Sequence, residues 1–166
     1  MVVRQLREAG IYDSITVATS QAQRDVIINQ LGEDIPIVTE PERRDTFPAI
    51  ALASSHLAYE RKCPADEVVI VMPCDPYTET GYFETIRRMA DAVKNNAAEL
   101  LLMGIKPTYP SEKYGYVVPT NDVQNEGILQ VLRFTEKPDM RTAEKLISEG
   151  AFWNGGVFAF RLGYMM

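Results

Sequence analysis

Residues 68–76 read VVIVMPCDP, an apolar run that ends in a proline, a cysteine and an aspartate. An apolar run without polar alternation is typical of a strand buried on both faces, as in the centre of a parallel sheet. In open α/β sheets, ligands bind beyond the carboxyl ends of the strands. Asp75 therefore stands where a binding site is expected.

Strand-like and helix-like patterns alternate on both sides of this run. Apolar residues with helical spacing occur before Gly10, between Ser20 and Gly32, after Pro48 and over residues 80–96. Shorter apolar segments at 15–18, 35–38 and 100–105 are predicted as strands. This alternation predicts an α/β fold with a mostly parallel twisted sheet flanked by helices.

The pattern changes after Pro107. Segments 116–119 and 128–135 alternate apolar and polar residues around the polar turn 121–127, which predicts a small antiparallel excursion. A short helix at 142–149 and a last strand at 157–161 follow. Because the chain has no repeat, low-complexity tract or linker, residues 1–166 are predicted as one domain.

Composition limits the classes of function. The chain has 17 Lys and Arg against 23 Asp and Glu, a net charge of −6, and 46% hydrophobic residues, enough for a sizeable core. The acidic balance argues against binding to duplex nucleic acid or to a membrane surface. No apolar run approaches the roughly 20 residues that span a bilayer. Two cysteines and one histidine argue against a zinc site and indicate a reduced, cytoplasmic protein.

Both ends of the sequence are expected to be cut. The first residues already follow a helical pattern without a preceding cap, and residues 162–166 begin a pattern without a terminator. The opening strand and glycine-rich phosphate turn that usually begin such a domain are absent. We therefore expect an internal piece of a longer protein.

Two segments of the first half carry candidate site residues. Asp75 suits a hard-oxygen ligand of Mg²⁺, and the alternative is a turn aspartate that caps its own backbone. In the segment EPERRDTFPAI, residues 40–50, main-chain N–H groups at a helix start could meet a phosphate or a base edge. The alternative is a solvated loop in which Asp45 or Thr46 caps the helix.

Three segments of the second half suit a sugar phosphate. In Tyr114-Gly115-Tyr116, a glycine between aromatic rings allows close approach of a sugar, although such residues are also ordinary in strand ends. Glu136 could accept hydroxyl hydrogen bonds beside the Lys137 ammonium, unless the two form only a surface ion pair. Asn154 can both donate and accept, while Trp153-Asn154-Gly155 also fits a core residue followed by a turn.

Read in order, five segments resemble the sugar-1-phosphate nucleotidyltransferases, and most closely the bacterial mannose-1-phosphate guanylyltransferases. The segments are EPERRDTFPAIALA, VMPCDPY, GIKPTYPSEKYGYVVP, RFTEKPD and FWNGGVFAFRLGYM. The resemblance implies a Rossmann-like nucleotidyltransferase core that joins GTP and mannose 1-phosphate to give GDP-mannose and pyrophosphate by direct in-line attack. It also implies small-molecule substrates and no nucleic-acid or membrane partner. A homodimer is one assembly that it allows.

The same resemblance implies roles for individual residues. Asp75 would bind the Mg²⁺ that bridges the phosphates, and Lys137 would hold the sugar phosphate, so these two would carry catalysis. Tyr114, Gly115, Glu136 and Asn154 would bind the sugar. The nucleotide would lie along the loop, at Glu40, Arg44, Asp45, Thr46, Pro48 and Ala49.

The sequence also departs from that family. Cys74 and Pro76 stand where Ser and His are common around the aspartate, and Asp45 stands where Asn is common, which leaves the base less certain than the reaction. A glycine-rich loop and a further metal-binding aspartate of the family are absent. The intact protein is therefore expected to be active and these 166 residues alone inactive. Alternatives are glucose 1-phosphate with dTTP or UTP, or a non-catalytic sugar-nucleotide-binding domain.

Overall fold

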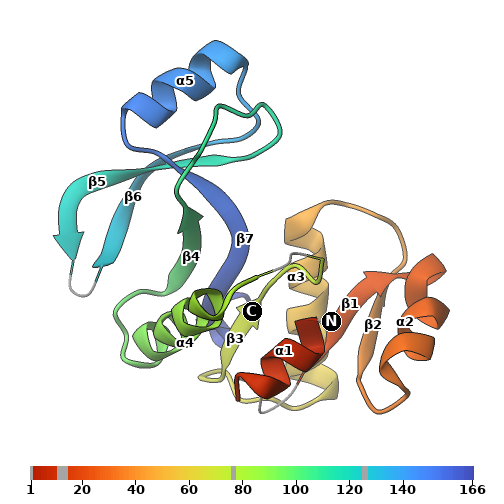
Figure 1. The fold of residues 1–166 in the computed structure, drawn as a ribbon. Helices are drawn as coiled ribbons and strands as arrows, with labels where there is room; N and C mark the ends of the chain where they lie inside the picture. Colours follow the sequence, from red (N-terminus) through yellow and green to blue (C-terminus); the bar gives the residue numbers. More distant parts are fainter. Residues whose placement is uncertain (1, 11–14, 76–77, 125–126) are drawn as a thin grey trace. The chain divides into compact units, whose positions relative to one another are not determined.

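A computed structural model of the chain describes residues 2–10, 15–75, 78–124 and 127–166 (Figure 1). These residues divide into two compact units, which the single predicted domain did not distinguish. The first unit contains residues 1–101 and 158–166, and the second contains residues 102–157. Strands β4 (Leu100–Ile105) and β7 (Phe152–Arg161) contribute residues to both units.

The first unit alternates helices and short strands. In chain order these are α1 (Val2–Glu8), β1 (Val17–Ser20), α2 (Arg24–Leu31), β2 (Ile37–Glu40), α3 (Thr46–Ser55), β3 (Val68–Val71) and α4 (Thr80–Lys94). Strands β1 and β2 pair in parallel, with Ser20 opposite Glu40 at the carboxyl ends of both strands. This pairing places Glu40 at the strand end where ligand sites of α/β folds are usual.

Helix α4 shows why the sequence predicted its elements well. Its apolar residues recur on one face, and Phe83, Ile86, Met89 and Val93 are all buried. The helix ends where Asn96 takes a left-handed φ of 58°, and the Asn96 and Ala97 N–H groups return to the carbonyls of the last turn. The Arg161 guanidinium donates to the Lys94 carbonyl at 2.9 Å and to the Asn96 side chain at 3.0 Å. It also donates to the Asp66 carbonyl, which joins β7 to the loop before β3.

The second unit is a sheet with one helix on it. It contains β5 (Tyr116–Gln124), β6 (Ile128–Thr135), α5 (Met140–Ser148) and the first residues of β7, and β4 pairs with β7. Helix α5 covers one face of the sheet (Figure 1). The core between them consists of Tyr116, Val118, Ala143, Leu146 and Ala151, with Ile147 and Trp153 packed against it.

The α/β class is confirmed, and the predicted excursion is the antiparallel pair β5–β6. Antiparallel pairing extends further than we predicted, because β7 also pairs antiparallel with both β3 and β5. Among the strand pairs whose register is defined for the described residues, β1–β2 is the only parallel one. The apolar run of β3 predicted a central strand buried on both faces, which is wrong: all four of its residues are only half-buried, and within the described ranges β3 pairs with β7 alone. Apolar residues by themselves fix neither the place of a strand in a sheet nor the direction of its neighbour.

Most element boundaries agree with the sequence within two residues, but β5 and β7 are each five residues longer than predicted. Strands β1 and β2 each begin two residues later than predicted, and β7 begins five residues earlier, at Phe152. The predicted turn 121–127 is wrong over residues 121–124, which continue β5 and pair with β6, while residues 125 and 126 lie outside the described ranges. None of the helices described is long and apolar enough to cross a membrane.

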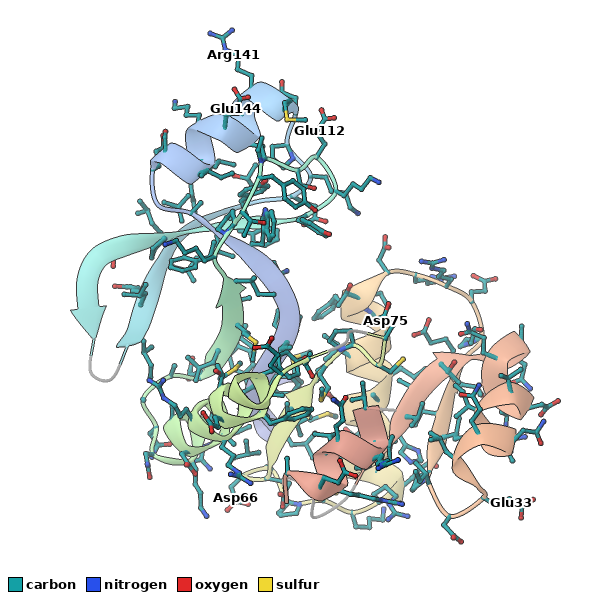
Figure 2. The ribbon with its side chains drawn as sticks, in the orientation of Figure 1. Glu33, Asp66, Asp75, Glu112, Arg141 and Glu144 are labelled. Carbon is teal, nitrogen blue, oxygen red and sulfur yellow. The ribbon has the colours of Figure 1, made fainter. Side chains whose placement is uncertain are left out.

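Two carboxylates fix the start of α5. Asp139 is the N-cap, and its side chain accepts a hydrogen bond from the Thr142 N–H at 2.8 Å. The Glu112 carboxylate accepts from the Met140 N–H at 3.1 Å, and Figure 2 shows Glu112 beside this end of the helix. Hydrogen bonding to Thr142 lowers the pKa of Asp139 below its ordinary value of 3.8.

This cap predicts a pH-dependent loss of stability. Because the folded-state pKa of Asp139 is lowered, its contribution is present above the unfolded-state value and is lost as the pH falls through the folded value. Asp139→Ala should therefore lower the unfolding temperature near neutral pH, with a difference from the unaltered chain that shrinks on acidification below about pH 4. Thermal unfolding followed by circular dichroism across this range measures it. Asp139→Asn, which keeps an acceptor, is the control, and a difference independent of pH would contradict this role.

Candidate functional site

Three predicted sugar-site residues lie side by side in the second unit. The Asn154 N–H donates to the Gly115 carbonyl at 2.8 Å, next to the register pair of Tyr116 with Trp153. The Glu136 carboxylate lies over Gly115, since a Cβ built on this glycine would be 2.6 Å from Glu136 Oε2. Residues from three separate segments thus form one polar row on the sheet.

Lys137 extends this row. Its N–H donates to the Tyr114 carbonyl at 3.2 Å, and its Nζ lies 3.4 Å from Glu136 Oε1. Both side chains of this ion pair are more than half exposed, so the pair itself adds little stability. The Lys137 backbone has a left-handed φ of 43°, which is uncommon for a residue with a side chain. Such strain concentrates at functional sites.

The space over Gly115 differs from what we expected. The glycine was expected to let a ligand approach the main chain, but protein atoms already fill the position of its missing side chain. Besides Glu136 Oε2, the Phe134 ring lies there, with its Cζ 2.7 Å from the built Cβ. Gly115 therefore makes room for Glu136 and Phe134, and a ligand on this side would meet those two side chains first.

Sequence reasoning did not single out Phe134 as a site residue. Part of the signal was present in the spacing, because Phe134 is the last but one residue of β6 and Glu136 follows the strand directly, two positions on. What the sequence lacked was the register, which pairs Phe134 with Val117 and so brings both side chains to Gly115.

Aromatic rings hold the segment before Gly115 in place. Trp153 contacts Tyr109 and Tyr114, with ring centroids 5.0 and 4.9 Å apart. Because Trp153 also packs against the core under α5, the structure favours its interpretation as a core residue. Hydrogen bonding to Tyr114 raises the pKa of Tyr109. The half-exposed Tyr114 ring is thus engaged with its neighbours, while its carbonyl holds Lys137.

Two hydrogen bonds also join the segment before Gly115 to strand β5. The buried Tyr116 hydroxyl accepts from the Ser111 N–H at 2.8 Å and donates to the Ser111 carbonyl at 3.1 Å. On the other side, Asn154 Oδ1 accepts from the Gly156 N–H at 2.9 Å, which fixes the Asn154 amide group and leaves its nitrogen as a donor. The polar row is therefore held by main-chain and core contacts.

In the first unit, the predicted nucleotide loop connects β2 to α3. Glu40 is the last residue of β2, and Thr46, Pro48 and Ala49 lie in the first turn of α3. Arg44 Nη2 lies 2.8 Å from Glu42 Oε2, and both side chains are exposed. The predicted place of Pro48 in the first helical turn is confirmed, where the missing N–H costs nothing.

Asp45 has the most unusual backbone of this loop. It precedes α3 with φ 64° and ψ −170°, a region that residues with side chains seldom adopt. Asp45 is the N-cap residue, but its side chain makes no capping hydrogen bond, so that part of the alternative is not seen, whereas the exposure of residues 41–48 agrees with a solvated loop. The ionised Asp45 carboxylate can therefore accept hydrogen bonds from donors other than this helix start.

Asp75 lies on the exposed loop that follows β3, four residues beyond the end of the strand (Figure 2). Pro76 and Tyr77 of the same predicted segment lie outside the described residues. No hydrogen bond or ion pair within the described ranges joins Asp75 to the loop from Glu40 to Ala49.

The surroundings of Asp75 bear on the predicted Mg²⁺ site. Within the part of the chain that the structure describes, no three His, Cys, Asp or Glu side chains gather closely enough to hold a metal ion. Magnesium is commonly held by one or two carboxylates together with substrate phosphates and water. A single exposed carboxylate fits that pattern, and it does not fit a metal held by protein alone.

Comparisons with known proteins show the family to which the chain belongs. The chain is 33% identical over 155 residues to the alginate biosynthesis protein AlgA of Pseudomonas fluorescens. It is also 33% identical over 161 residues to mannose-1-phosphate guanylyltransferase 2 of Escherichia coli O157:H7. The two alignments cover 90% and 87% of this chain but 32% of each relative, so the chain spans about a third of these proteins.

A solved structure and a protein family complete the comparison. The crystal structure described as a mannose-1-phosphate geranyltransferase from Thermus thermophilus matches with a TM-score of 0.83 at 27% identity, over 99% of this chain and 47% of that chain. The predicted nucleotidyltransferase core is thereby confirmed. The family described as nucleotidyl transferase matches over residues 1–166. The chain therefore belongs to the nucleotidyl transferase family.

Proposed function

We propose that the protein carrying this chain transfers a guanylyl group from GTP to mannose 1-phosphate, giving GDP-mannose and pyrophosphate in a Mg²⁺-dependent reaction. The family and the name of the Escherichia coli relative support this reaction class. The observation that carries it is the polar row of the second unit, in which Gly115, Glu136 and Asn154 lie together beside Lys137.

The polar row suits a hexose phosphate. The Glu136 carboxylate accepts hydrogen bonds from hydroxyls, and the Asn154 amide nitrogen donates to hydroxyl oxygens. The Lys137 ammonium supplies a compact positive charge for the phosphate. Its exposed contact with Glu136 is weak enough to be exchanged for a phosphate without a large cost.

The first unit suits the nucleotide. Main-chain N–H groups at the start of α3 offer donors to a base and ribose, and the Asp45 carboxylate, which makes no capping hydrogen bond, offers an acceptor. Glu40 ends strand β2, a few residues before this helix start. The Arg44 guanidinium can offset part of the negative charge of the nucleotide phosphates. Asp75 would hold the Mg²⁺, which would neutralise phosphate charge when bound.

The reaction needs no protein nucleophile. An oxygen of the mannose 1-phosphate attacks the α-phosphorus of GTP, and the bond from that phosphorus to the bridging oxygen of the β-phosphate breaks. Pyrophosphate leaves with that oxygen. Because the attacking phosphate is already ionised near neutral pH, a strong base is unnecessary. The barrier is lowered by holding two anions in line and by neutralising their charge, which is the role of Lys137 here.

Asp75→Asn tests the metal assignment. The amide loses the charge that holds Mg²⁺, so turnover in the full-length protein should fall by about a hundredfold or more, while GDP-mannose binding weakens less. Pyrophosphate release from GTP, mannose 1-phosphate and Mg²⁺ measures turnover, and calorimetry measures binding. Asp66→Asn, another exposed aspartate of the first unit, is the matched control (Figure 2). Unchanged turnover in Asp75→Asn would remove the residue from the mechanism.

The choice of substrates is tested separately. The unaltered protein should release pyrophosphate fastest with GTP and mannose 1-phosphate in a panel that includes dTTP, UTP and glucose 1-phosphate. Faster turnover with glucose 1-phosphate and dTTP or UTP would keep the reaction class but contradict the proposed substrates. Binding of GDP-mannose without turnover on any pair would favour a binding domain.

Gly115 and Glu136 are tested by a double-mutant cycle. A Cβ at residue 115 would collide with Glu136 Oε2, so Gly115→Ala should displace the carboxylate and raise the KM for the sugar phosphate by about tenfold or more. Glu136→Asp withdraws the carboxylate by one methylene group and should also raise the KM for the sugar phosphate. The double variant should lose less than the product of the two single losses, because the shorter side chain relieves the collision with the carboxylate and leaves only the contact with the Phe134 ring. Independent effects would show that Gly115 does not act through Glu136.

A further inference from the structure

The Phe134 ring occupies an unusual position for an apolar side chain. Its Cζ and Cε2 lie 2.7 and 3.1 Å from the place where a Gly115 Cβ would be, next to the Glu136 carboxylate oxygen. Yet 47% of the residue is exposed. A half-exposed aromatic ring therefore lies beside the carboxylate that we assign to sugar hydroxyls.

The core of the second unit does not account for this ring. That core lies under α5 and is built from Tyr116, Val118 and the helix. Phe134 is paired with Val117, the residue between those two, and successive residues of a strand point to opposite faces. Phe134 therefore faces away from α5, on the same side as Glu136.

The chemistry of a hexose fits this pairing of side chains. A sugar ring has hydroxyls around its rim and C–H groups on its faces, so sites for sugars combine hydrogen-bonding groups with an apolar surface. Glu136 supplies the first and the Phe134 ring the second, and both are fixed at one point because Gly115 has no side chain. An apolar ring left half in water gains stability when a ligand covers it.

We propose that Phe134 is a further substrate-contacting residue, whose ring packs against a C–H face of the hexose while Glu136 binds its hydroxyls. This inference rests on the proposed function, since it deepens the description of the same sugar site. It assigns to Phe134 part of the affinity for the sugar phosphate and none of the affinity for the nucleotide.

The experiment measures KM for both substrates in the full-length protein. Phe134→Ala should raise the KM for mannose 1-phosphate about five- to tenfold and leave the KM for GTP unchanged. Phe134→Leu keeps apolar volume, so its KM for mannose 1-phosphate should lie between those of Phe134→Ala and the unaltered protein. Phe134→Tyr should have the same KM as the unaltered protein. The control is Leu132→Ala, because Leu132 lies on the same strand, is 66% exposed and falls where the β5–β6 register shifts. It should change neither KM.

A second arm separates contact from positioning. If Phe134 touches the sugar, Phe134→Ala should still raise the KM for the sugar phosphate at least about threefold in a Glu136→Ala background. If the ring only props the carboxylate, the effect should vanish there, and the inference would be overturned. It would also be overturned by an unchanged sugar-phosphate KM in Phe134→Ala, or by an equal rise for GTP.

The outcomes also distinguish this inference from the proposed function. If the unaltered protein turns over another hexose 1-phosphate and nucleotide, the same variants are measured with that pair, and the inference stands or falls on them. If the unaltered protein turns over no pair of the panel, the proposed function fails and this inference fails with it. Turnover with normal sugar-phosphate KM in every Phe134 variant contradicts this inference alone.

Discussion

The second unit depends on the absence of a side chain at residue 115. Glu136 and Phe134 both reach into the space that a Cβ would take, and neither could lie there beside any larger residue. The Gly115 carbonyl meanwhile accepts the Asn154 N–H, and the Tyr114 carbonyl accepts the Lys137 N–H. One glycine and its neighbour thus determine where a carboxylate, an amide, an ammonium and an aromatic ring lie. The core under α5 holds the strands that make this possible.

Two of the residues with a positive φ, Asp45 and Lys137, lie next to or in weak, exposed ion pairs. Asp45 in the first unit and Lys137 in the second both have left-handed backbones, at a cost of about 1–3 kcal/mol each. Regular elements on both sides of each residue hold it there. Arg44 and Lys137 each lie in an exposed ion pair with a nearby glutamate. Such pairs contribute about 0–1 kcal/mol, so both cations can turn to phosphates with little loss. In the proposed reaction, this arrangement would let an acidic chain present two cationic groups to phosphates.

Much of the fold could be predicted because local signals decided it. The helical spacing through Phe83, Ile86, Met89 and Val93 and the glycine stop at Gly32 both reappear in the structure. The direction of β7 could not be predicted, because its apolar residues carry no information about which strands lie beside it. The candidate residues were found from segment order, but the relation of Phe134 and Glu136 to Gly115 depends on strand register. Likewise, the unusual backbone of Asp45 is set by the connection from β2 to α3, which residue types alone do not reveal.

The most direct test is a crystal structure of the full-length protein with GDP-mannose and Mg²⁺. The account predicts hexose hydroxyls within hydrogen-bond distance of the Glu136 carboxylate and the Asn154 amide, and a C–H face of the sugar against the Phe134 ring. The account would be contradicted by a hexose bound away from these three side chains, with no ligand atom near the Glu136 and Phe134 side chains over Gly115.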